Sequence, residues 1–274
     1  MDVLSRLYEP GADAQRAWFP LSLRVVTPFV LLFATAAAAI LGGAGPSVIT
    51  RPVAAAGCHG GLLAAAFAAA WGRSPGWKRP AWLLTALLFL ASAATQLAPW
   101  GAAAYLLVPV ALSALGWRRV ELRRIGWRPA TPLALLLGAG VGAFLGAHLL
   151  LSASRTLGYS TRLTPLGPLL AAVAYDAGAN VLSSELFFRG VIFNFWHRRS
   201  GFWTGALIST AACLFRYLLD PALPRSLEVT IGALFYVTLL GLTTCLLFAA
   251  SGSVLPPLLA ASIFFGAYRT LHLS

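Results

Sequence analysis

The sequence predicts an all-α fold, a polytopic bundle of transmembrane helices with eight or nine spans. Hydrophobic residues make up 59% of the 274 residues and charged residues only 10%. The mean hydropathy of +0.79 is far above that of a soluble globular domain. Apolar runs of about 20 residues, the length that crosses a bilayer, recur along the chain. The predicted spans are 25–44, 53–71, 81–98, 101–117, 130–151, 167–193, 203–219, 229–249 and 253–271.

Four of these spans have features that affect the expected architecture. Only Pro99, Trp100 and Gly101 separate the third span from the fourth, so the two form either a tight hairpin or one interrupted span. The sixth span is long and polar inside, and we expect a tilt or a break near Gly178. Charged residues precede the first span, so no cleavable signal pattern is present and this span is expected to remain as an anchor.

The net charge of +12 is distributed in a way that indicates membrane topology. With the N-terminus inside, 13 of the 20 Lys and Arg residues fall in inside loops and 5 in outside loops. This bias predicts a cytoplasmic N-terminus and contact with anionic lipid, and it disfavours nucleic acid as a partner. Heavy use of Ala, Arg, Gly and Leu with a single Lys is compatible with a bacterial inner-membrane protein.

A basic segment at 117–128 divides the chain into two parts. Residues 1–128 contain about four spans and the basic cytoplasmic loop, with almost no polar residues at membrane depth. Residues 129–274 contain the candidates for chemistry. Because an ionised side chain in a bilayer is costly unless it is paired, intramembrane acids and arginines indicate functional sites.

Glu185 and Arg189 lie four residues apart in the sixth span, in the order that favours pairing on a helix. Asp176, Asn180 and Ser183 recur at helical spacing upstream and form a polar stripe roughly opposite Glu185. Such a stripe serves either interhelical hydrogen bonding or a substrate path.

The other candidate residues are more scattered. Arg216 in the seventh span either extends to the lipid headgroups or points inward as a second positive centre near Arg189. His148 lies near the end of the fifth span, and no two histidines have metal-ligand spacing. Cys213 is an unpromising nucleophile because no base is evident beside it.

The run from Ser184 to Gly190, SELFFRG, resembles the EExxxRG motif of the CPBP family of intramembrane proteases. This family includes type II CAAX prenyl endopeptidases and bacteriocin-processing and self-immunity proteins. The run from Ser251 to Leu259, SGSVLPPLL, is similar to the segment that precedes the family's HxxxN motif. The resemblance covers about residues 130–271 and implies a CPBP-like membrane core at 129–274.

The catalytic residues that the resemblance implies are replaced in this chain. The family uses the first Glu of EExxxR, a His from FxxxH, and the His and Asn of HxxxN. The corresponding positions hold Ser184, Leu219, Ala261 and Phe265. These side chains cannot bind a metal or accept a proton from water, whereas Glu185 and Arg189, the structural pair, remain.

The leading interpretation is therefore an inactive or repurposed homologue without a cofactor. It would bind a transmembrane or lipidated protein tail, a lipid, or a partner protease in the former substrate cavity. A second interpretation is an active peptidase that uses Glu185 with His148 or Asp176, and with a divalent metal such as zinc if the site is active. A third is a transporter of small solutes or lipids, which would use the polar stripe, Arg189 and Arg216 as an anion path.

Overall fold

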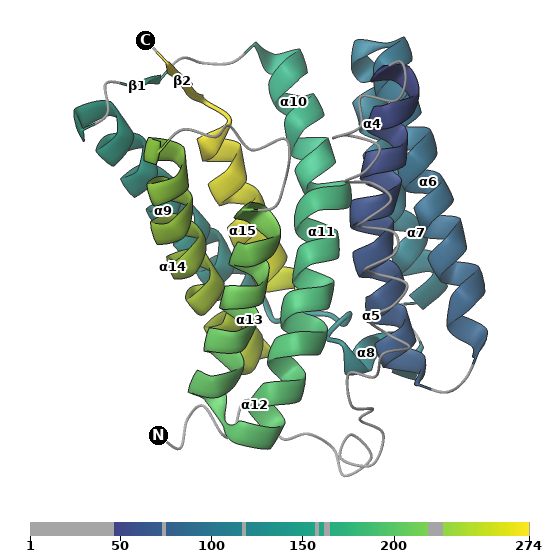
Figure 1. Cartoon of the computed structure of the whole chain (residues 1–274). Coiled ribbons are helices and arrows are strands. Elements are labelled where there is room, and N and C mark those ends of the chain that lie inside the picture. Colours follow the sequence, from purple (N-terminus) through teal and green to yellow (C-terminus); the bar gives the residue numbers. More distant parts are fainter. Residues whose placement is uncertain are drawn as a thin grey trace.

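The computed structural model describes residues 47–72, 75–116, 119–156, 159–161, 165–218 and 227–273. They form a bundle of helices that run roughly side by side (Figure 1). Each predicted span within these ranges coincides with helix, which confirms the predicted fold class. The span predicted at 25–44 and the position of Leu219 lie outside the described residues.

The first described helix is continuous but contains a wide turn. It consists of α4 (Ser47–Ala55), η1 (Ala56–Gly60) and α5 (Gly61–Trp71). In η1, a π-type segment, the backbone stays right-handed helical while the turn widens. Such segments are frequent at functional sites because they re-aim the side chains that they carry.

The next two predicted spans form a hairpin. After η2 (Pro75–Trp77) and α6 (Lys78–Leu97), Ala98 adopts an extended conformation and ends the helix. The chain then returns along α6 through η3 (Pro99–Leu106) and α7 (Leu107–Gly116). The hairpin, rather than one interrupted span, is therefore the arrangement in the structure.

The central helix of the bundle runs from residue 166 to residue 200. It comprises α10 (Leu166–Tyr175), η4 (Asp176–Asn180), α11 (Val181–Ser184), η5 (Glu185–Phe193) and α12 (Asn194–Ser200). Both η4 and η5 are π-type segments. Of the expected tilt or break near Gly178, the break does not occur, because the helix widens there and continues; the tilt stays a prediction.

The remaining helices complete the bundle. α8 (Val120–Arg124) is a short turn before α9 (Pro132–Thr156), and α13 (Phe202–Leu218) follows the central helix. α14 (Leu227–Ser251) and α15 (Leu255–Tyr268) end the helical part.

One short ribbon accompanies the helices. Strands β1 (Tyr159–Thr161) and β2 (Leu271–Leu273) pair antiparallel, with Tyr159 opposite Leu273. In the described part of the chain it is the one exception to the helical fold.

Small residues allow the helices to approach closely. A Cβ at Gly142 of α9 would collide with the carbonyl oxygen of Ala260 in α15, and one at Gly178 with that of Tyr105. Close backbone contact is a main source of helix association in lipid, where the hydrophobic drive is weak.

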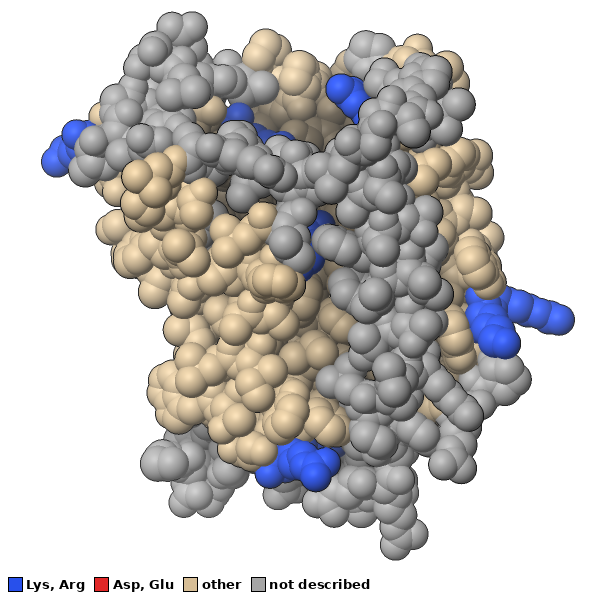
Figure 2. All heavy atoms as spheres, viewed as in Figure 1, with Lys and Arg blue, Asp and Glu red and all other residues tan. Residues whose placement is uncertain are grey.

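The outer surface of the bundle suits a lipid environment. Large apolar side chains such as Trp82, Phe144 and Trp203 are well over half exposed. Among the described residues, no acidic side chain is visible on the face in Figure 2, where most of the coloured surface is uncharged. Helices long and apolar enough to cross a membrane are Thr50–Trp71, Lys78–Leu97, Pro132–Arg155 and Thr230–Ser251. Trp100–Leu115 and Leu255–Tyr268 are shorter apolar helices.

Candidate functional site

The predicted pair of Glu185 and Arg189 lies at the centre of the bundle. Arg189 Nε is 3.3 Å from Glu185 Oε2 and donates a hydrogen bond to Thr244 Oγ1 of α14 at 2.9 Å. Glu185 is 3% exposed and Arg189 is 1% exposed. Each charge is therefore balanced by the other inside the protein, as their spacing predicts.

Two thiols border this pair. Cys213 of α13 lies against the Arg189 guanidinium, and Cys245 of α14 is also close to it. Together with Thr244 they complete what we call the ion-pair cluster. Three helices thus meet around one buried guanidinium.

Several polar atoms around the ion-pair cluster have no hydrogen-bond partner. They are Ser184 Oγ, Glu185 Oε2, Arg189 Nη1 and Thr210 Oγ1, all fully buried. Native proteins rarely leave buried polar atoms unsatisfied, so these atoms are available to bind a water molecule or a ligand group.

The same cluster does not fit a divalent metal. Within the described ranges, no three His, Cys, Asp or Glu side chains converge as metal ligands. Arg189 also places a positive charge directly against the Glu185 carboxylate, and that charge opposes a bound cation.

A second set of polar side chains lies along the preceding turns of the central helix, and we call it the His59 network. Its members are His59, Tyr175, Asp176, Asn180, Ser183, Arg216, Tyr217 and Arg269.

His59 joins the network from η1 in the N-terminal part of the chain. Its Nδ1 is 3.2 Å from Ser183 Oγ and its Nε2 is 2.8 Å from Tyr175 OH. The imidazole is 2% exposed. Both ring nitrogens are thus engaged, and the tautomer decides which of them donates.

The predicted polar stripe forms the middle of the network. Asn180 Nδ2 donates to Asp176 Oδ1 at 3.1 Å, and Arg216 Nη1 donates to Asn180 Oδ1 at 3.1 Å. Arg269 Nη2 lies 3.3 Å from Asp176 Oδ1. The stripe thus makes interhelical hydrogen bonds. Arg216 is 5% exposed and points inward, so extension to the headgroups is not its role here.

Sequence reasoning did not select His59. The residue precedes the region of family resemblance and has no partner at recognisable spacing. A usable signal was its position in an otherwise apolar span, because an ionisable residue at membrane depth is a functional-site hypothesis by default. The small residues around it, Ala56 to Gly60, allow the wide turn that carries it.

The structure does not bring His148 to the candidate site. This residue is exposed on α9, and its Nδ1 bonds to Tyr236 OH of α14 at 2.9 Å. Asp176 is engaged by Arg269 and Asn180. Neither residue acts as the hydrogen-bonded partner of Glu185 that the second interpretation requires.

Two of the replaced family positions face the interior of the bundle. Ala261 is 1% exposed within an apolar cluster of α9, α14 and α15. The Phe265 ring stacks on Tyr217 of the His59 network, with centroids 5.6 Å apart. These residues supply an apolar wall where the resemblance implies a His and an Asn.

Comparison with known proteins agrees with the likeness in the motifs. Residues 165–265 match the family model described as type II CAAX prenyl endopeptidase Rce1-like. No curated protein and no solved structure matches the chain.

The matched region starts just before the central helix and ends at Phe265. It therefore contains the ion-pair cluster and most of the His59 network, although His59 and Arg269 lie outside it. With its apolar helices, the chain is an integral membrane protein. Over residues 165–265 it is similar to the Rce1-like family of type II CAAX prenyl endopeptidases.

Proposed function

We propose that this protein is a non-hydrolytic homologue of the CAAX-type intramembrane endopeptidases. In this role it holds a transmembrane or lipidated protein tail in its interior, in a bacterial inner membrane, with its N-terminus in the cytoplasm. The observation that carries the proposal is the set of groups that contact the Glu185 carboxylate. Its carboxylate pairs with Arg189, and no imidazole among the described residues bonds to it.

Hydrolysis requires a group that activates water. The neighbouring position holds Ser184, and the last family motif holds Ala261 and Phe265. None of these side chains can act as a general base or bind a metal. The arginine keeps the remaining acid in an ion pair, so the usual route to peptide-bond cleavage is lost.

The unsatisfied atoms favour retained binding. Ser184 Oγ and Arg189 Nη1 are buried and still able to hydrogen-bond. A backbone carbonyl of a bound tail could accept from both of them. The same atoms would serve a lipid or a segment of a partner protease, and the experiment below uses a lipidated tail as its probe.

The test uses the full chain in proteoliposomes and a farnesylated CAAX peptide with a photoreactive group. We expect labelling of the protein without cleavage, and weaker labelling of Arg189→Met. Arg199→Gln, which removes an exposed arginine at the end of α12, is the matched control and should label normally.

Two results would overturn the proposal. Cleavage that Glu185→Gln abolishes would show an active peptidase, and equal labelling of wild type and Arg189→Met would show that the cluster does not hold the tail. The variant Ser184→Glu/Leu219→His/Ala261→His/Phe265→Asn restores the family residues. Peptidase activity in this variant would support the proposal that the chain retains the scaffold of the peptidase family.

One observation favours a second function, an active peptidase with a displaced site. His59 Nδ1 lies 3.2 Å from Ser183 Oγ, which is within the range of a nucleophile and its base. If this second function is right, the wild-type protein should cleave the peptide in the same assay. His59→Gln and Ser183→Ala should each abolish cleavage, whereas Glu185→Gln should still cleave.

A further inference from the structure

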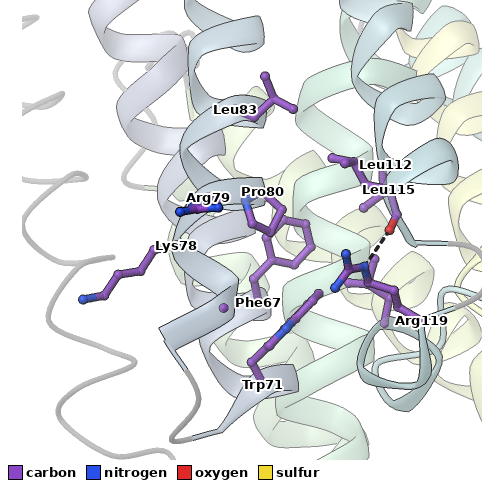
Figure 3. A pocket seen from close by; sticks show the side chains of 11 residues that line it. Phe67, Trp71, Lys78, Arg79, Pro80, Leu83, Leu112, Leu115 and Arg119 are labelled. Carbon is purple, nitrogen blue, oxygen red and sulfur yellow. Dashed lines mark hydrogen bonds between the residues drawn. The ribbon is translucent and has the colours of Figure 1, made fainter.

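A hollow outside the candidate site lies between the end of α5 and the start of α8. Its volume is about 840 Å³, in the range of small-molecule binding sites. Its lining includes Phe67, Trp71, Arg79, Leu112, Leu115 and Arg119. Figure 3 shows these side chains on two sides of the opening, one side from α5 and α6 and the other from α7 and the segment before α8.

The hollow has an apolar floor and a basic rim. Phe67 and Leu112 are fully buried at its base. Arg79 and Arg119 are exposed at its edge, and in Figure 3 the Arg119 guanidinium reaches toward the space beside Trp71. Apolar depth with positive charge at the mouth is complementary to an amphiphile that carries an acidic headgroup.

The rim arginines form no ion pair with the residues that the structure describes. Neither ion pair found in the described part of the chain includes Arg79, Arg119 or the nearby Lys78. Arg119 Nε donates to the Leu115 carbonyl oxygen at 3.1 Å, and this hydrogen bond orients the guanidinium without cancelling its charge. Lys78 also lines the hollow, although in Figure 3 its side chain points away from Arg119, so among the described residues Arg79 and Arg119 are the arginines at its mouth.

The position along the chain also suits a lipid. Three helix ends form the rim at one end of the bundle. One helix ends at Trp71, the next starts at Lys78, and α7 ends beside them. Spans of this length end near the headgroups. The charge bias predicts that both loops face the cytoplasm, whose leaflet carries anionic lipid.

We infer that this hollow binds one anionic phospholipid, with the phosphate between Arg79 and Arg119 and an acyl chain against Phe67, Leu112 and Leu115. The site is separate from the ion-pair cluster and the His59 network. It does not depend on whether the protein is a peptidase.

The test measures lipid retention by native mass spectrometry on the full chain, with phosphatidylglycerol and phosphatidylcholine as probes. We expect preference for phosphatidylglycerol, and a loss of about thirtyfold in its affinity for Arg79→Gln/Arg119→Gln, since each basic residue near an anionic surface contributes about fivefold. The control Arg155→Gln/Arg199→Gln removes the same charge from helix ends away from the hollow and should retain the lipid.

A second variant tests the apolar part without changing charge. Leu115→Trp should narrow the hollow and weaken phosphatidylglycerol binding severalfold. Equal retention of both lipids, or equal loss in the control pair, would overturn the inference. Binding of glycerol phosphate as tight as that of the whole lipid would also overturn it, since the hollow would then be an anion site that does not use the acyl chain.

Discussion

Breaking the buried ion pair should cost far more than removing it whole. Arg189 is 1% exposed, and its nearest compensation is Glu185, with one hydrogen bond to Thr244. Glu185→Gln would leave the guanidinium buried with no counter-charge in contact. Breaking a buried pair in this way costs about 3–5 kcal/mol, whereas replacing both members by apolar residues of similar volume is close to neutral. We therefore expect a large loss for the single variant and recovery in Glu185→Leu/Arg189→Met.

The measurement is the free energy of unfolding in mixed micelles, read as a double-mutant cycle over the two single variants and the pair. Thr243→Ala is a suitable control, because this neighbour of Thr244 is only partly buried and bonds to its own helix backbone. A loss below about 1 kcal/mol for Glu185→Gln, or a double variant as unstable as the sum of the singles, would refute the reasoning.

Three further predictions concern other parts of the fold. His59→Leu should destabilise the protein by about 1–3 kcal/mol because it removes the hydrogen bonds that the imidazole makes with Ser183 and Tyr175; an unchanged unfolding free energy would contradict the network. Gly142→Val should cost about 1–3 kcal/mol or more through its collision with α15, while Gly140→Val, which meets nothing, should cost little and serves as control. Burial is the main cause that lowers the pKa of His197 below its ordinary value of 6.5, and the positive charge of Arg198 lowers this pKa further. The unfolded chain then binds more protons just below pH 6.5, so stability should fall as the pH drops from 6.5 toward the folded-state pKa. A titration of unfolding free energy should show this slope in wild type and lose it in His197→Gln.

Much of the fold could be predicted because apolar run length reports span length directly. The predicted span at 130–151 corresponds to α9, and that at 229–249 corresponds to α14. Local backbone geometry was harder to predict from the sequence. The wide turn at Gly178 depends on the close approach of Tyr105, some seventy residues earlier, and no local pattern reveals that contact.

The candidate site was predictable where its members lie on one helix. The spacing of Glu185 and Arg189 predicts their contact, because residues four apart share a helix face. His59 was not predictable in the same way, since its partners Tyr175 and Ser183 are more than a hundred residues distant. His148 does not reach the site, because its imidazole is exposed on α9 and hydrogen-bonds to Tyr236 of α14.

The two polar groups inside the bundle are physically linked through α13. Cys213 lies against Arg189 in the ion-pair cluster, and Arg216 bonds to Asn180 in the His59 network. Residues three apart on a helix share a face, so the two groups are separated by about one turn of α13. Ser184, with its unsatisfied hydroxyl, stands between Ser183 of one group and Glu185 of the other. If a tail is held at Ser184 as proposed, it would lie beside residues of both groups, and the N-terminal helix of His59 would then border the binding interior although it lies outside the region of family similarity.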